Sequence, residues 1–310
     1  MNNKLLPLIV IEGADGAGTT TQAKTLVERL GAMLAASSPP ENFVHGTASE
    51  PLGKTHGDTR PGVLLTRQPS DGPIGQQIRA ILTGRERPLS SPSAFQLMFT
   101  ADRLDHVSRV VGPALRDDAI VVSDRYDLST AIYLAASEPR YRCPVDGCGW
   151  TGDEWPMGSS IAKYMPAPQP VVHDHEPDDR EAMLLMQAFA WNEMAPRPLV
   201  TIVLAVSAEV AAERRALRGG KAELFEQTEF QRRVCRLYSN AHDTYSRGNA
   251  LESREQRWRP IGLGSPVVKI NGEASEERVA AEVFDAARTA LRGLRAHRKR
   301  VSDWKSGHDR

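Results

Sequence analysis

A glycine-rich segment near the start of the chain has the residue types and spacing of a loop that binds nucleotide phosphates. Gly13 and Gly18 enclose four residues and are followed by Thr19 and Thr20, which matches the pattern G-x-x-x-x-G-K-[ST] except at the lysine. Glycines let backbone N–H groups converge on phosphate oxygens, and the Thr20 hydroxyl would bind Mg²⁺. Because Thr19 is neutral, the segment predicts a phosphate site and leaves its catalytic strength open. The residues expected at the nucleotide are Gly13, Ala14, Asp15, Gly16, Ala17, Gly18, Thr19, Thr20 and Thr21.

Apolar runs that alternate with amphipathic stretches place this loop in an α/β fold. Helical apolar spacing at 20–34 follows the loop, and Ser91 before Pro92 is typical of a helix start. Helices between successive strands predict a P-loop NTPase-type parallel β-sheet of about five strands, flanked by helices on both faces. Ligands of such sheets lie outside the carboxyl ends of the strands. Buried strands are expected at residues 5–11, 63–65, 119–122, 199–206 and 266–270.

We predict a single domain over residues 1–292, with insertions at about 36–62 and 137–179 and a lid near 214–224. Residues 293–310 are basic and weakly periodic, which favours a frayed tail. Lys plus Arg number 39 and Asp plus Glu number 39, so no global field attracts nucleic acid or an anionic membrane. No apolar run approaches the roughly 20 residues of a membrane span, and a cytoplasmic location is expected.

Four segments, taken together, resemble the thymidylate kinase family. They read E-G-A-D-G-A-G at 12–18, T-R-Q-P at 66–69, F-T-A-D-R at 99–103 and D-R-Y-D-L-S-T at 124–130. Their order and spacing match the family as well. The resemblance implies transfer of the γ-phosphoryl group from ATP to dTMP, giving dTDP and ADP, with Mg²⁺ as cofactor. It also implies a homodimer.

Arginines are suited to phosphate groups because the planar guanidinium can bond two oxygens at once. The resemblance assigns Arg67, Arg103 and Arg125 to the acceptor monophosphate. Each could instead be a surface ion-pair residue. Asp124, at the end of a buried strand, is expected to hold Mg²⁺ or its water shell together with Thr20, and the alternative is a structural pairing with Arg103.

The resemblance also assigns residues to the acceptor's sugar and base. It places Asp15 near the phosphate and sugar, stacks Phe99 on the thymine ring, and puts Thr130 and Tyr133 beside the base edge. From periodicity alone Phe99 is as compatible with a core position. Because the family often has Asn or Gln next to that Tyr, Thr130 and Leu134 leave open a kinase for another deoxynucleoside monophosphate.

The charge missing at Thr19 has a candidate replacement after the fourth strand. Family members of the bacterial type, with Gly at the position of Gly16, carry an arginine in the lid, which assigns Arg215 and Arg218 to catalysis. For these arginines, the alternative is a solvated helix face. For the protein as a whole, the alternative is a nucleotide-binding regulatory protein that is catalytically weakened at Thr19. The residues expected to act in catalysis are Asp15, Arg103, Arg125, Arg215 and Arg218.

The insertion at 137–179 contains a candidate structural zinc site. Cys143 and Cys148 flank a short turn that contains glycine, so both thiolates could reach one tetrahedral ion. His173 and His175 would complete the four ligands. The spacing matches no standard zinc finger, and the alternative is two reduced thiols and two loop histidines.

Overall fold

The computed structural model describes residues 6–36, 45–47, 62–137, 187–188, 190–219, 223–241 and 266–308. The proposed zinc ligands Cys143, Cys148, His173 and His175 lie outside these residues, and so do residues 220–222 of the predicted lid. The zinc site therefore stays a prediction.

The centre of the molecule is a parallel sheet with the strand order β2-β3-β4-β1-β5-β6. The α/β fold predicted from the sequence is confirmed, with five strands at the expected places. Strand β2 is an addition at the edge, inside the segment that the sequence indicated to be a loop. It has only three residues, too few for a strand pattern, and it pairs with β3. The strands are β1 (Leu8–Gly13), β2 (His45–Thr47), β3 (Val63–Arg67), β4 (Ile120–Asp124), β5 (Val200–Ala205) and β6 (Val267–Asn271).

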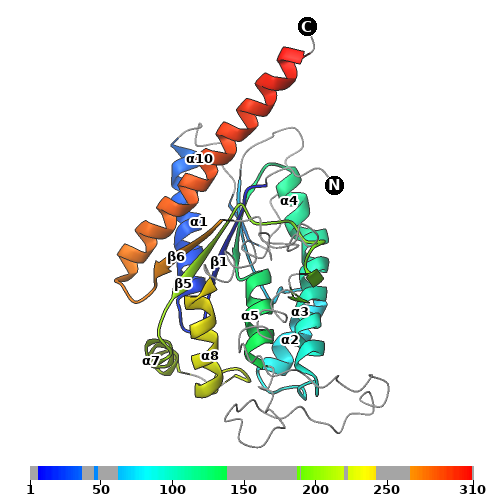
Figure 1. Cartoon of the computed structure of the whole chain (residues 1–310), viewed down its shortest axis with the longest axis vertical. Helices are drawn as coiled ribbons and strands as arrows, with labels where there is room; N and C mark the ends of the chain where they lie inside the picture. The colour runs from blue at the N-terminus through cyan, green and yellow to red at the C-terminus, as the bar shows by residue number, and fades with distance from the viewer. Residues whose placement is uncertain are drawn as a thin grey trace, which may run out of the picture.

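Helices cover both faces of the sheet. In Figure 1, α1 and α10 lie together on one side, and α3, α4 and α5 lie on the other. Ser91 caps α3 as predicted, because its side chain accepts a hydrogen bond from the Ala94 N–H at 3.3 Å. The helices are α1 (Thr19–Ala35), α2 (Pro73–Leu82), α3 (Pro92–His106), α4 (Gly112–Arg116), α5 (Asp127–Ser137), α7 (Ala208–Arg218), α8 (Thr228–Ser239) and α10 (Glu276–His308).

The central strand β1 is apolar along its length because it is buried on both faces. Successive side chains of a strand point to opposite faces. Accordingly, Leu8 and Val10 join an apolar cluster with Leu115 of α4, whereas Ile9 and Ile11 join the cluster that contains Leu26 of α1. Because β1 is packed on both faces, the core fixes the position of the loop that follows it.

The C-terminal segment is helical, and the prediction of a frayed tail at 293–310 was wrong. Helix α10 continues to His308 and projects beyond the body of the molecule in Figure 1. Leu291 and Leu294 remain buried, so packing continues past residue 292. The following residues include Ala, Arg and Lys, which extend an existing helix at little cost.

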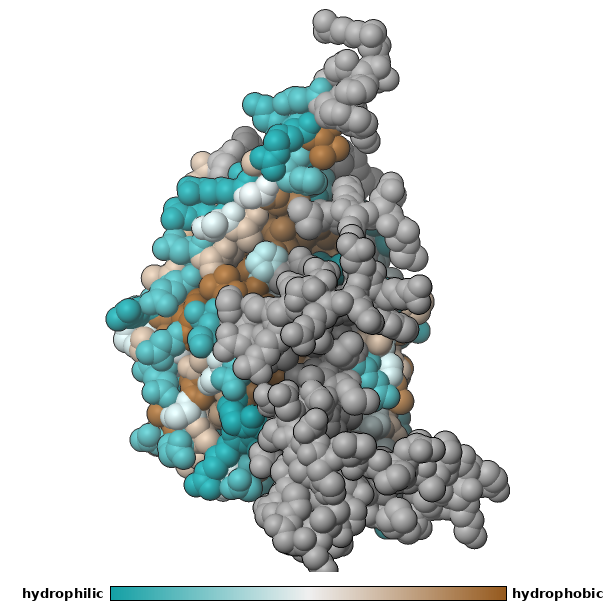
Figure 2. Space-filling model, viewed as in Figure 1, coloured by the Kyte–Doolittle hydropathy of each residue, from teal (hydrophilic) through white to brown (hydrophobic). Residues whose placement is uncertain are grey.

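The described helices turn hydrophilic residues outward. On the face drawn in Figure 2, hydrophilic residues cover the outer edge, and apolar residues show as a stripe beside them. Among the described residues, no helix has both the length and the apolar character needed to span a bilayer.

Replacing Leu294 tests whether α10 is anchored beyond residue 292. Leu294→Ala removes a side chain that is 4% exposed, and we expect the free energy of unfolding to fall by about 2–4 kcal/mol. The control Val301→Ala alters a residue that is 40% exposed and should change it by less than about 0.5 kcal/mol. Urea unfolding measures both, and equal effects would contradict the packing of this segment.

Candidate functional site

The carboxyl ends of three neighbouring strands meet at one cavity. Pairing of β1 with β4 puts Ile11 opposite Asp124, and pairing of β3 with β4 puts Arg67 opposite Asp124. The adjoining cavity has a volume of about 570 Å³. Most of the site residues predicted from the sequence lie on its wall, namely Asp15, Gly16, Gly18, Thr19, Thr20, Thr21, Arg67, Phe99, Arg103, Asp124, Arg125, Thr130, Tyr133, Arg215 and Arg218.

The loop after β1 has the backbone of an anion-binding turn. Gly16 and Gly18 have φ values of 94° and 92°, in the left-handed region that favours glycine. Gly18 directly precedes α1, so the free N–H groups of that helix face the cavity. Ala14 and Ala17 are buried and support the loop from below without lining the cavity.

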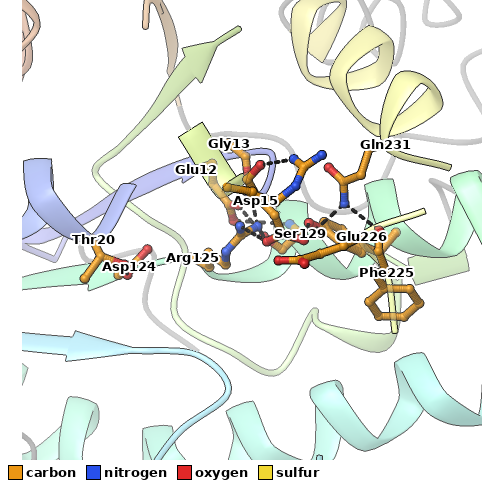
Figure 3. A network of polar contacts seen from close by, with 12 residues as sticks. Glu12, Gly13, Asp15, Thr20, Asp124, Arg125, Ser129, Phe225, Glu226 and Gln231 are labelled. Atoms are coloured by element: carbon orange, nitrogen blue, oxygen red, sulfur yellow. Dashed lines mark hydrogen bonds and ion pairs between the residues drawn. The ribbon is translucent and has the colours of Figure 1, made fainter. Parts of the chain in front are cut away.

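Thr20 and Asp124 form a pair that fits Mg²⁺. The Thr20 hydroxyl donates to Asp124 Oδ2 at 2.5 Å, as Figure 3 shows. Asp124 Oδ1 is buried and has no hydrogen-bond partner among the described residues. One hydroxyl and one carboxylate suit a hard cation that takes its other ligands from phosphate and water. No group of three or more His, Cys, Asp or Glu within the described ranges could hold a metal ion by itself.

Arg125 joins the loop after β4 to the loop after β1. Its Nη2 donates to Asp15 Oδ1 at 2.6 Å, and its Nη1 donates to the Gly13 carbonyl at 2.7 Å. Burial disfavours the charged guanidinium, but Tyr133 and Asp15 outweigh this effect and raise the pKa of Arg125. The residue has a φ of 69°, a backbone conformation that a non-glycine residue adopts at a cost and that often marks a functional site.

Arg103 lies on the cavity wall, but most of its N–H donors are hydrogen-bonded to other protein atoms. Its Nε donates to Gln68 Oε1 at 2.8 Å, and its Nη2 donates to the Tyr126 carbonyl at 2.6 Å and to Thr130 Oγ1 at 2.9 Å. Nη1 donates to Asn192 Oδ1. Arg103 is 1% exposed. Its bonds connect α3 to the loop after β3, to Asn192 and to the start of α5, which indicates a structural role at the site. Among the described residues, the Asp124 carboxylate is bonded to Thr20 and not to Arg103.

The remaining acceptor-side residues differ in exposure. Arg67 is half exposed and pairs with Asp71 at 2.7 Å. Tyr133 is buried, and its hydroxyl donates to Asp15 Oδ2 at 2.9 Å. Phe99 is partly buried and meets Phe95 edge-on, with ring centroids 5.3 Å apart. Phe99 was compatible with a core position or with a position at the ligand. Its ring meets both descriptions, because it packs on the core and also lines the cavity.

Helix α7 brings arginines to the loop after β1. Arg215 is 9% exposed, and its Nη1 donates to the Asp15 carbonyl at 2.5 Å. The approach is close, since a Cβ built on Gly16 would lie 2.5 Å from the Ala211 carbonyl oxygen. Arg218 is more exposed and pairs with Glu226 at 2.8 Å. Arg215 therefore contacts the loop after β1, whereas Arg218 contacts the segment after α7.

Glu12 supports the site, although it is not among the site residues predicted from the sequence. Its side chain is fully buried and accepts hydrogen bonds from the Tyr126 N–H at 2.8 Å, the Ser129 N–H at 3.2 Å, the Ser129 hydroxyl at 2.5 Å and the Tyr238 hydroxyl at 3.0 Å. Burial raises the pKa of Glu12, and the bond from Ser129 opposes this effect. An acidic residue at the end of a buried strand was the available signal.

Two more residues of the site were missed by the sequence reasoning. Arg79 of α2 lines the cavity and donates to the Pro69 carbonyl. Its burial and, to a smaller extent, the positive charge of the neighbouring Arg67 lower its pKa. Gln231 of α8 donates to Asp15 Oδ2 at 3.1 Å. Neither residue belongs to a motif, so only the tertiary structure identifies them.

The cavity wall is strongly positive. Seven arginines line it, against the three carboxylates Asp15, Asp124 and Glu223. A site with this balance and a glycine-rich loop favours polyanions. The arginines are Arg67, Arg79, Arg103, Arg125, Arg214, Arg215 and Arg218.

A parallel sheet whose first strand leads into this loop, beside a Thr–Asp pair, defines a P-loop NTPase fold with an arginine-lined pocket. Residues 47–142 match the family model described as Thymidylate kinase. The resemblance to thymidylate kinases seen in the sequence is thereby confirmed, both over these residues and in the relatives named next.

Similar curated proteins carry the same name. The thymidylate kinase of Dinoroseobacter shibae is 34% identical over 139 residues, 45% of this chain and 55% of the relative. That of Geotalea daltonii is 37% identical over 125 residues, 40% of this chain and 46% of the relative. That of Desulfotalea psychrophila is 25% identical over 263 residues, 84% of this chain and 95% of the relative. The chain thus spans about half the length of the first two relatives, and a longer but weaker match covers nearly all of the third.

Neutralising Glu12 should destabilise the fold. Glu12→Gln replaces one acceptor oxygen by an NH₂ group that faces donors, and we expect the free energy of unfolding to fall by about 1–3 kcal/mol. Glu28→Gln on the exposed face of α1 is the matched control and should change it by less than about 0.5 kcal/mol. Chemical denaturation at pH 7 compares the two, and a loss no larger than that of the control would remove the supporting role of Glu12.

Proposed function

We propose that this protein is an active thymidylate kinase that transfers the γ-phosphoryl group of ATP to dTMP, giving dTDP and ADP. The observation that supports this most is that a P-loop and a second set of arginines line the same cavity. One anion site would suffice for a nucleotide-binding regulator. Two facing sites are what a transfer between two phosphates requires.

Phosphoryl transfer depends on placing two anions in line and neutralising their charge. A phosphate oxygen of dTMP attacks the γ-phosphorus as the bond to the ADP oxygen breaks. The loop amides and the N-terminus of α1 would hold the donor phosphates, and Arg67 and Arg125 would hold the acceptor phosphate. Thr20 and Asp124 would hold Mg²⁺, which supplies positive charge at the donor phosphates.

Tyr133 and Asp15 are placed for the acceptor's sugar. Tyr133 presents its ring to the cavity while its hydroxyl is bound to Asp15. Phe99 offers a flat face beside it for the base. Thr130 already accepts a hydrogen bond from Arg103, so its hydroxyl hydrogen and one lone pair remain for the edge of a base.

We also infer that Arg215 supplies the charge that Thr19 lacks. Thr19 is 6% exposed, and the Arg125 guanidinium is neutralised by Asp15. The Arg215 guanidinium donates to a neutral carbonyl of the loop. Arg215 also lines the cavity, so its positive charge is available to a bound phosphate. The homodimer, the absence of a nucleic-acid partner and the cytoplasmic location stay predictions.

An assay of the purified full chain with ATP, Mg²⁺ and a panel of nucleoside monophosphates tests the proposed function. We expect dTDP from dTMP, and a drop of about 100-fold or more in the double variant Thr20→Ala, Arg125→Ala, because each change removes a phosphate or metal contact. A stronger preference for another deoxynucleoside monophosphate would replace dTMP as the substrate. ATP binding without turnover of any acceptor would instead favour the regulatory protein.

Substitutions at Arg215 and Thr19 test the replacement of the lysine. Arg215→Gln should lower kcat about ten- to a hundred-fold, since a charge-assisted hydrogen bond is lost. Adding Thr19→Lys to Arg215→Gln should recover much of that activity, whereas Thr19→Lys alone should help little. Arg232→Gln on the exposed side of α8 is the control and should leave kcat within about twofold. The idea fails if Arg215→Gln retains wild-type kcat.

A further inference from the structure

Helix α8 contacts the P-loop through a buried amide, that of Gln231. This side chain is fully buried, and its Nε2 donates both to Asp15 Oδ2 at 3.1 Å and to the Phe225 carbonyl at 2.7 Å. Figure 3 shows the amide between the two acceptors. A primary amide has two N–H donors, and Gln231 divides them between the P-loop and the segment that precedes α8.

The segment at 223–227 forms part of the cavity wall through Phe225. The Phe225 ring stacks on Phe230 with centroids 5.1 Å apart and an interplanar angle of 16°. It also meets Tyr133 edge-on at 5.2 Å. Tyr133 is itself bound to Asp15 Oδ2. Phe225 and Asp15 are therefore linked twice, through the Gln231 amide and through Tyr133.

Two further hydrogen bonds join the segment at 223–227 to neighbouring elements. The Leu224 N–H donates to the Leu82 carbonyl at 3.0 Å, and Glu226 accepts from Arg218 at 2.8 Å. The second of these is exposed and adds little. The Phe225 ring is further held by packing against Phe95, with centroids 5.7 Å apart, and the buried bond to Gln231 is the contact that holds the Phe225 carbonyl itself.

We infer that Gln231 is a positioning residue that couples the segment at 223–227 to Asp15. Its amide keeps the Asp15 carboxylate aimed at the acceptor's sugar only while Phe225 is seated against Tyr133 and Phe230. The identity of the acceptor rests on the proposed function, whereas the coupling rests on the contacts alone. The coupling makes binding of the acceptor, and not of ATP, sensitive to the segment at 223–227.

Kinetics of Gln231→Met test this coupling, because methionine keeps the length of the side chain and removes both donors. We expect KM for dTMP to rise about ten-fold or more, while KM for ATP stays within about twofold. The control Arg232→Gln changes the neighbouring exposed residue of the same helix and should leave both values within about twofold. Equal rises in both KM values would indicate that Gln231 merely docks α8, and they would overturn the proposal.

A second variant, Gln231→Glu, has a readout that a merely structural residue would not move. Its carboxylate would face Asp15, with Arg125, Tyr133 and Arg215 as the other titratable neighbours, and burial beside a like charge raises the pKa of such a group. Once protonated, it can again donate to Asp15. We therefore expect its activity relative to the wild type to rise as the pH is lowered, and a constant ratio would count against the coupling. The variant keeps size and polarity, so it serves if Gln231→Met does not fold.

Hydrogen exchange separates failure of this inference from failure of the proposed function. The Leu224 amide should exchange about ten-fold faster in Gln231→Met than in the wild type, and at the wild-type rate in Arg232→Gln. This readout needs no turnover. If the wild type makes no dTDP yet this difference appears, the coupling stands and the proposed substrate falls. Unchanged exchange at Leu224 would overturn the coupling whatever the activity.

Discussion

The contact between Arg125 and Asp15 is the interaction on which the rest of the site depends. The two residues follow neighbouring parallel strands, β4 and β1, and the guanidinium reaches Asp15 Oδ1 at 2.6 Å. Arg125 does so from a left-handed backbone conformation, which the surrounding bonds must hold in place. Glu12 contributes by fixing the backbone of Tyr126 one residue further on. The loop after β4 is thus bonded directly to the loop after β1, and the two loops form adjoining parts of the cavity wall.

With the neutral residue Thr19 in the P-loop, the cations that line the cavity lie on other elements. A P-loop lysine would bring its charge on the first turn of α1, on a long and flexible side chain. Here the cations come from other elements, and several are restrained by bonds to backbone carbonyls. Arg215 is bound to the Asp15 carbonyl, Arg125 to the Gly13 carbonyl and Arg79 to the Pro69 carbonyl. Restrained donors lose less entropy when a phosphate binds, so fixed arginines suit a loop that lacks its own charge.

The parts of the site that the sequence predicted are those encoded by short local patterns. The Thr20–Asp124 pair follows from a P-loop and a buried strand, and the cap at Ser91 follows from one dipeptide. Gln231 could not be found in this way, because its contact with Asp15 spans 216 positions and depends on how α8 docks. For Arg103, residue type and motif indicated a phosphate ligand. Its burial and its bonds to Gln68, Tyr126 and Thr130 show a structural role. Periodicity cannot reveal such a role, because the partners come from other parts of the chain.

The acceptor capacity of Asp15 limits what it can do for a ligand. A carboxylate has about four acceptor positions, and three donors already occupy Asp15: Arg125 on Oδ1, and Tyr133 and Gln231 on Oδ2. Roughly one position is left, on the oxygen bound by Arg125. Since the Asp15 side chain is 28% exposed, that position can face the cavity. Under the proposed function, Asp15 would accept one hydrogen bond from a hydroxyl of the acceptor, and the three protein donors would already hold its carboxylate in place.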